Sequence, residues 1–152
     1  MLEWLKTNAA KARGTLTSEV LKLKNRSFME ATAAACAMIA AADGEVSAAE
    51  KTKMIGFISN SPELKVFDLT EVIKAFNEAV AKFEFDQQIG QAEALKVISK
   101  VKGNDGASRL LVRVACAIGT SDGDFDEKEK AACRQICIEL GLSPADFELQ
   151  GS

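Results

Sequence analysis

One segment occurs twice in this chain, and the repeat limits the fold more than any other feature of the sequence. Residues 39–51 read IAAADGEVSAAEK, and residues 118–130 read IGTSDGDFDEKEK. Each copy has the end of an apolar helix, then Asp-Gly, an acid, an apolar residue, a capping residue and Glu-Lys. Two helix–loop–helix units in one small domain predict an internal pseudo-twofold repeat, which would bring the two acidic loops to equivalent places.

Helical periodicity also dominates the rest of the chain. Capping residues open several segments, and Ser61-Pro62 and Ser143-Pro144 each place a Ser before Pro at a first helical position. The apolar spacing predicts buried faces of two long helices at residues 72, 73, 76, 80 and 83, and at residues 89, 95, 97, 98 and 101. We expect helices at about 27–42, 47–59, 69–83, 86–102, 106–121 and 126–140, with one or two before Asn25. Two shorter helical segments are expected at about 62–67 and after Pro144. The sequence thus predicts an all-α fold, a compact single-domain bundle of about seven to eight helices.

Composition and charge divide the chain into a short arm and a helical domain. Its 152 residues are 47% hydrophobic, which suits one domain with a real core. Residues 1–24 are predicted to be a basic amphipathic arm, and residues 25–152 the helical domain. Residues 1–26 hold six Lys and Arg against two acids, while the whole chain has a net charge of −3. The body is therefore acidic, which argues against a nucleic-acid partner.

The first residues do not resemble a signal peptide, and the longest apolar run, residues 31–42, is about half a membrane span. A cytoplasmic location is therefore expected. Apolar residues alternate with bases in the arm, which suits a helix packed on its own bundle or one lying on the anionic inner membrane. The packed arrangement is favoured, because the apolar stripe is short and Trp4 is a weak anchor.

The titratable residues remove many classes of enzyme. The chain has no histidine, so catalytic triads, Cys-His pairs and imidazole metal sites are excluded for this chain acting alone. Cys36, Cys116, Cys133 and Cys137 lie in apolar periodic segments and are predicted to be reduced core thiols. Cys133 and Cys137 share a helix face, so a site for tellurite or another soft metalloid is an alternative, but their counterparts in the first repeat are Met54 and Ile58.

Capping explains part of each repeated loop. Ser47 with Glu50, and Asp126 with Glu129, have the spacing of a capping box, and Gly44 and Gly123 would end the preceding helices in a left-handed conformation. Capping does not explain Asp43 and Asp122, because a carboxylate at a helix C-terminus faces the negative end of the helix dipole, which is unfavourable.

A bound cation would compensate these misplaced acids. The loop is not an EF-hand, since Glu127 and Cys133 occupy its sixth and twelfth positions counted from Asp122. Two apposed loops could supply the oxygen ligands that calcium, magnesium or manganese prefers. The candidate ligands are Asp43, Glu50, Asp122 and Glu129, with Glu45, Asp124 and Asp126 as secondary candidates. The alternative is capping combined with a solvated acidic face.

Several segments that accompany the repeat carry a resemblance to a known family. They are KMIGF at 53–57, ELKVFD at 63–68, EVI at 71–73, FEFD at 83–86 and GLSPADF at 141–147. With the paired Asp-Gly-x5-Glu-Lys segments, they make the chain from about Lys24 to Phe147 resemble the bacterial tellurite-resistance family TerB. The resemblance implies an all-helical cytoplasmic protein whose acids bind metal, which acts among tellurite-resistance and stress-response proteins and associates with a TerC-like membrane protein.

The function expected from these features is that of a noncatalytic module that binds a divalent cation and a protein partner. One alternative is a metal-independent acidic scaffold or adaptor. A thiol- or metal-dependent enzyme acting on tellurite is the less favoured alternative, because no activated nucleophile is visible in the sequence.

Overall fold

The computed structural model describes residues 14–19, 25–44, 46–62, 64–120 and 125–149. Within these ranges the chain forms helices and turns and no strand, which confirms the all-α fold. The helices are α3 (Arg26–Ala40), α4 (Ala48–Asn60), α5 (Leu69–Phe85), α6 (Gln87–Ile98), α7 (Asp105–Gly119) and α8 (Glu127–Glu139), with 3-10 turns η1 (Ser99–Val101) and η2 (Pro144–Phe147). Residues 14–19 are also helical. No helix in the described ranges is long and apolar enough to cross a membrane.

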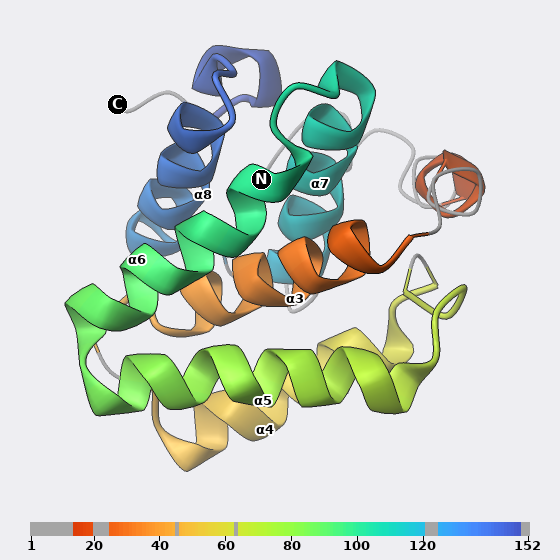
Figure 1. Cartoon of the computed structure of the whole chain (residues 1–152). Helices are drawn as coiled ribbons and strands as arrows, with labels where there is room; N and C mark the ends of the chain where they lie inside the picture. The colour runs from red at the N-terminus through yellow and green to blue at the C-terminus, as the bar shows by residue number, and fades with distance from the viewer. Residues whose placement is uncertain (1–13, 20–24, 45, 63, 121–124, 150–152) are drawn as a thin grey trace.

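Helix α3 runs through the middle of the molecule, with α4 and α5 on one side and α7 and α8 on the other (Figure 1). Every residue from Ala31 to Ala40 is buried. A helix that is apolar on all sides belongs in the interior of a bundle. Because most of these side chains are single methyl groups, the neighbouring helices approach the α3 backbone closely. Leu16, from the predicted arm, is buried in the same core; residues 1–13 and 20–24 of that arm lie outside the described ranges.

Capping side chains begin four of these helices, and two of them, Ser47 and Asp126, were predicted. Ser47, Asp68, Asp86 and Asp126 each accept a hydrogen bond from a backbone N–H in the first turn of α4, α5, α6 and α8. Asn25 and Asn104 do the same for α3 and α7. These caps satisfy backbone N–H groups that have no partner inside the helix. A few neighbouring residues are therefore enough to predict where each helix begins.

Two local predictions were wrong. Residues 62–67 were expected to form a short helix, but the described residues there form hydrogen-bonded turns, in which Leu64 is pulled into the core. Ile89 was expected to be buried, but it is 45% exposed. The adjacent Gly90 is the residue of α6 that packs against α5, since a Cβ placed there would lie 2.6 Å from Cα of Phe83. Ile89 therefore points away from this contact.

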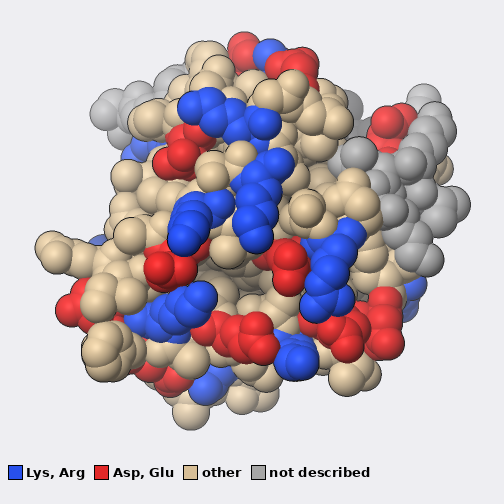
Figure 2. All heavy atoms as spheres, in the orientation of Figure 1, with Lys and Arg blue, Asp and Glu red and all other residues tan. Residues whose placement is uncertain are grey.

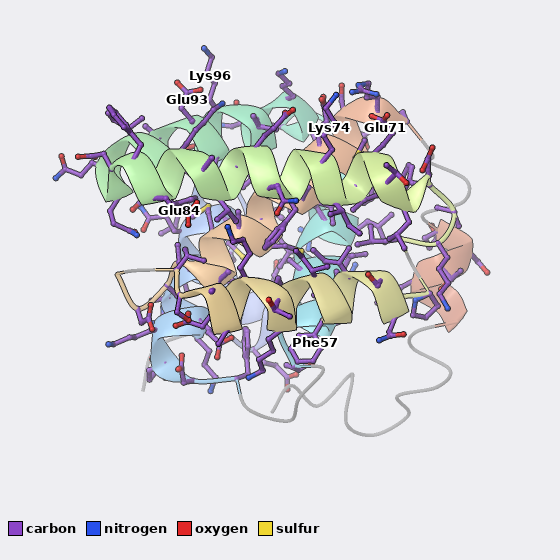
Figure 3. The ribbon with its side chains drawn as sticks, turned by 90° about the horizontal axis from the view of Figure 1, so that it is seen from below. Phe57, Glu71, Lys74, Glu84, Glu93 and Lys96 are labelled. Carbon is purple, nitrogen blue, oxygen red and sulfur yellow. The ribbon has the colours of Figure 1, made fainter. Side chains whose placement is uncertain are left out.

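Charged side chains of both signs cover the face formed by α3, α5 and α6, around a shallow hollow (Figure 2). On the opposite side of α5 lies α4 (Figure 3). Lys51 of α4 pairs with Glu84 of α5 at 3.6 Å. Exposed pairs of this kind contribute little to stability. The apolar contacts with α3 therefore hold the bundle together.

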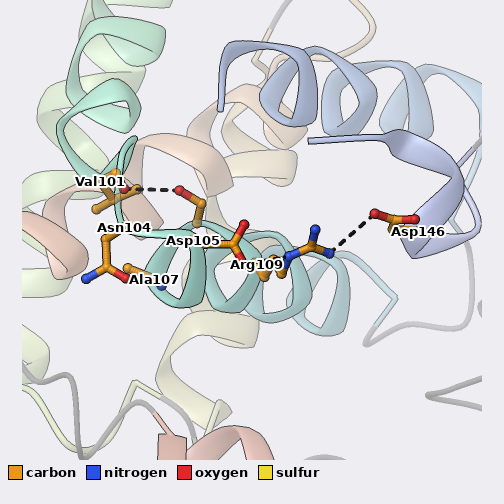
Figure 4. Close-up of polar contacts among 7 residues, drawn as sticks. Val101, Asn104, Asp105, Ala107, Arg109 and Asp146 are labelled. Atoms are coloured by element: carbon orange, nitrogen blue, oxygen red, sulfur yellow. Dashed lines mark hydrogen bonds and ion pairs between the residues drawn. The ribbon is translucent and has the colours of Figure 1, made fainter. Parts of the chain in front are cut away.

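Three arginines hold the C-terminal segment against α7 and α8. Arg109 pairs with Asp146 at 3.3 Å (Figure 4), and the guanidinium of Arg113 lies 5.3 Å from the ring centroid of Phe147. Arg134 Nη1 donates to the carbonyl of Leu149 at 2.9 Å. Phe147 and Leu149 are fully buried, so this segment is part of the core. The chain reaches it through Gly141, which has a left-handed conformation with φ of 74°.

Candidate functional site

The loop after α3 places the first pair of predicted ligands. Gly44 has φ of 99°, as predicted, and its N–H donates to the carbonyl of Ala41. Ser47 then begins α4: its Oγ accepts from the Glu50 N–H at 3.1 Å and donates to Glu50 Oε1 at 3.2 Å. The Glu50 carboxylate is thereby fixed at the first turn of α4, while Asp43 is exposed at the end of α3.

The loop after α7 places the second pair. The predicted capping box is confirmed: Asp126 Oδ1 accepts from the Glu129 N–H at 2.8 Å, and Glu129 Oε1 accepts from the Asp126 N–H at 3.1 Å. Phe125, just before the cap, packs on the last turn of α7, where a Cβ on Gly119 would lie 2.9 Å from its ring. The predicted ligands Asp122 and Asp124 lie outside the described residues, as does Glu45 of the first loop.

The two loops share one cavity of about 200 Å³. Asp43 and Glu50 line it from the first helix–loop–helix unit, and Asp126 and Glu129 line it from the second. Three of the four principal ligand candidates and one secondary candidate thus come together, although they lie far apart in the sequence. Ile39, Met54 and Phe57 supply apolar lining. Whether the two units are related by a pseudo-twofold axis stays a prediction.

Two lysines also line this cavity, and the sequence reasoning did not assign them to the site. They are Lys53 of α4 and Lys128 of α8. Lys53 Nζ lies 5.8 Å from the ring centroid of Phe57, within range of a cation–π interaction. Lys53 follows Glu50 by three residues, and this helical spacing could have indicated that they share a face. The four carboxylates therefore share the cavity with two ammonium groups.

The described residues alone do not form a closed metal site. None of them belongs to a group of three or more His, Cys, Asp or Glu side chains close enough to hold one ion. A carboxylate has about four lone-pair positions, so the capping bonds of Glu50, Asp126 and Glu129 leave acceptor capacity. The chemistry of the carboxylates suits a hard cation, but a full coordination shell needs ligands beyond these four.

The cysteines are confirmed as core residues. All four are free thiols and all four are buried, on α3, α7 and α8. Burial raises the pKa of Cys36 and of Cys137 to about 12. The pKa of Cys133 is also raised, by its hydrogen bond with Cys116 and by burial. Cys36, Cys133 and Cys137, with their raised pKa, are therefore neutral at physiological pH, whereas reactive cysteines have a lowered pKa and an accessible sulfur.

Fold and site together define an all-α protein in which two acidic helix–loop–helix units open onto one cavity. Residues 29–151 match the family model described as Tellurite resistance protein TerB. A relative from an Alcaligenes species, named Tellurium resistance protein TerB, is 49% identical over 102 residues, which cover 67% of this chain and 84% of that relative. No solved structure gives a significant match. The chain belongs to the TerB family of tellurite-resistance proteins.

Proposed function

We propose that this protein is a noncatalytic component of a tellurite-resistance and stress-response system, and that it binds a divalent cation between its two acidic loops. One observation carries this proposal: Asp43 and Glu50 from one loop line the same cavity as Asp126 and Glu129 from the other.

Ligand number decides which further residues the ion needs. Calcium takes about six to eight oxygen ligands and magnesium about six, several of them waters. No three of the four described carboxylates are close enough to hold one ion as they stand, so at most two of them supply part of this shell. The remaining protein ligands would come from Asp122 and Asp124, which belong to the same loop as Asp126, and from Glu45. The absence of histidine in the sequence and the burial of every cysteine favour calcium, magnesium or manganese over zinc.

The noncatalytic part of the proposal rests on the same chemistry. All four thiols are buried, so they are out of reach of tellurite in the folded protein. The cavity holds carboxylates and ammonium groups, and the carboxylates of Asp126 and Glu129 are fixed by hydrogen bonds from backbone N–H groups rather than arranged around a nucleophile. A role in binding needs only the charges of these carboxylates and ammonium groups, and no activated nucleophile.

We further propose that the protein works in the cytoplasm with other tellurite-resistance proteins, including a TerC-like membrane protein. Family membership supports this association. Residues 1–24 would provide a peripheral contact with the inner membrane, through six positive charges that extend to Arg26. The burial of Leu16 limits such a contact to the other residues of the arm.

A second candidate function is that of a metal-independent acidic adaptor. Lys53 and Lys128 favour it, because two ammonium groups inside the cavity already offset half the charge of the four carboxylates. In this case the acidic loops would bind a basic surface of a protein partner, and no ion would be needed.

Calorimetric titration of calcium, magnesium and manganese into chelator-stripped protein separates the two functions. The Asp43→Asn/Asp122→Asn variant removes one acid from each loop, and the Glu84→Gln/Glu139→Gln variant removes the same charge outside the cavity. We expect saturable binding by the wild type and the control, and none by the loop variant at unchanged helical content. An absence of binding by the wild type would overturn the cation site and leave the adaptor.

A further inference from the structure

One exposed side of α5 carries a row of side chains with charges of both signs. Helical spacing of three and four residues puts one row of side chains on this side. The row comprises Glu71, Lys74, Glu78, Lys82 and Phe85. Figure 3 shows Glu71 and Lys74 pointing to the same side as Glu93 and Lys96 of α6, which is the face seen in Figure 2. The small residues Ala75 and Ala79 lie between the charges and line the hollow of this face.

The order of charges in this row is self-complementary. When two α5 helices lie antiparallel about a twofold axis near Phe76, Glu71 faces Lys82 of the second copy, and Lys74 faces Glu78 of the second copy. The other two pairs follow by symmetry. Lys74 and Glu78 form no ion pair with any other described residue, whereas Glu71 and Lys82 make exposed pairs with Arg26 and Glu93 at 3.6 and 3.7 Å. Such exposed pairs are weak and exchange readily.

Phe85 ends the row and is the most exposed large apolar side chain in the described part of the chain, at 79%. At the opposite end of α5 lies an apolar pocket of about 260 Å³. It is lined by Asn25, Arg26, Met29, Phe67, Asp68 and Glu71. A cavity of about 150 Å³ is enough to hold a benzene ring, so this pocket has room for an aromatic side chain.

The same antiparallel register joins these two features. With Glu71 opposite Lys82, Phe85 lies one turn farther along and faces Asp68 of the second copy, at the mouth of that pocket. The twofold axis makes the contact twice. An exposed aromatic residue, a matching apolar pocket and a self-complementary charge row thus agree on one geometry, and each is a separate observation.

We propose that this protein forms a symmetric homodimer through antiparallel α5 helices, in which Phe85 of each copy fills the apolar pocket between the starts of α3 and α5 in the other. The four charge pairs set the register, and the two aromatic contacts supply most of the affinity, as buried aromatic residues do in interfaces. The acidic cavity does not contribute to this interface, so the proposal is independent of the proposed cation site.

Sedimentation velocity over a wide range of protein concentration, at low salt, tests this dimer. We expect the wild type to change from monomer to dimer as concentration rises, and Phe85→Ser to weaken association by more than about tenfold. Ile138→Ser is the matched control, because Ile138 is 69% exposed on α8, outside the proposed interface. A wild type that stays monomeric at every concentration, or equal weakening by both variants, would overturn the proposal.

A charge swap tests the register. Lys74→Glu and Glu78→Lys should each weaken the dimer, because each places like charges opposite one another twice. The double variant restores opposite charges across the twofold axis, so it should associate like the wild type. Because both residues are exposed, circular dichroism should show equal helix content in all three variants. A double variant that associates no better than the single ones would show that the helices do not meet in this register.

Discussion

The ring of Phe125 lies against the backbone of Gly119, so closely that a methyl group at Gly119 would stand 2.9 Å from it. This contact joins the last turn of α7 to the residue that precedes the cap of α8. It therefore holds together the two helix ends that flank the second acidic loop. Gly119 also lines the acidic cavity. The absence of a side chain at Gly119 therefore makes room both for the Phe125 ring and for the cavity.

Gly119→Ala should destabilise the protein by about 1–2 kcal/mol, because the Phe125 ring has to move in a packed core. Gly56→Ala is the control: it lies inside α4 with nothing within 4 Å of a Cβ, and should stabilise the protein by about 0.5–1 kcal/mol. Urea unfolding followed by circular dichroism measures both. If the two variants shifted stability in the same direction, the packing of Phe125 on Gly119 would not be limiting.

Capping and charge can be separated at Asp126. Asp126→Ala removes the acceptor of the Glu129 N–H and should cost about 1 kcal/mol of unfolding free energy. Asp126→Asn keeps the acceptor and removes the charge, so its stability should stay near that of the wild type. Both variants should lower the affinity for a divalent cation in calorimetric titration. An Asn variant as unstable as the Ala variant would show that the carboxylate charge, and not the hydrogen bond, supports the cap.

Because the thiols are buried, the free energy of unfolding should depend on pH in the alkaline range. Burial raises the pKa of Cys36 and Cys137 from an ordinary value of 9.0 to about 12. Between these values the unfolded chain releases the thiol protons while the folded protein keeps them. Their stabilising contribution is complete below pH 9 and decreases as the pH rises toward 12, by up to about 1.4 kcal/mol per thiol and pH unit.

Urea unfolding at several pH values above 8 checks this slope. It should be shallower in Cys36→Ala than in the wild type, after the loss of stability at pH 7 is subtracted. Labelling of the native protein with a thiol reagent should be slow at pH 8 and fast in denaturant. Rapid labelling of the native protein would contradict the burial of the four thiols.

Arg134 should control the attachment of the C-terminal segment. Its bond to the Leu149 carbonyl, at 2.9 Å, is one of three arginine contacts with this segment. Arg134→Gln should cost about 1–2 kcal/mol, because the carbonyl loses a charged donor in a partly buried place. Carboxypeptidase digestion should then remove residues up to Leu149 faster than in the wild type. Unchanged digestion would mean that burial of Phe147 and Leu149 alone holds the segment.

The sequence predicted helix starts better than tertiary contacts, for a physical reason. Caps such as Ser47 and Asp126 act within one helical turn, so a few neighbouring residues decide where a helix begins. Residues 62–67 show the limit: Ser61-Pro62 favours a helix start, but burial of Leu64 in the core stabilises turns instead. Propensity is a weak preference that tertiary packing can override.

The candidate site was predicted in part. The repeat located both acidic loops, and Asp43, Glu50 and Glu129 do line one cavity. Lys53 and Lys128 were not assigned to it, because their approach depends on how α4 and α8 pack around α3. Ile89 was misplaced for a similar reason: periodicity alone does not show that the close approach at Gly90 decides which side of α6 meets α5.

Helix α3 connects the two places where we expect ligands. Met29, near its start, lines the pocket for Phe85, and Ile39, near its end, lines the acidic cavity. Its 15 residues span about 22 Å. Alanine methyl groups leave neighbouring helices in contact with its backbone, and we expect this close packing to hold α3 in place when either site is occupied. Binding of a cation in the acidic cavity and binding of Phe85 from a second copy should therefore be independent. Saturating the cavity with a cation should leave the dimerisation constant unchanged.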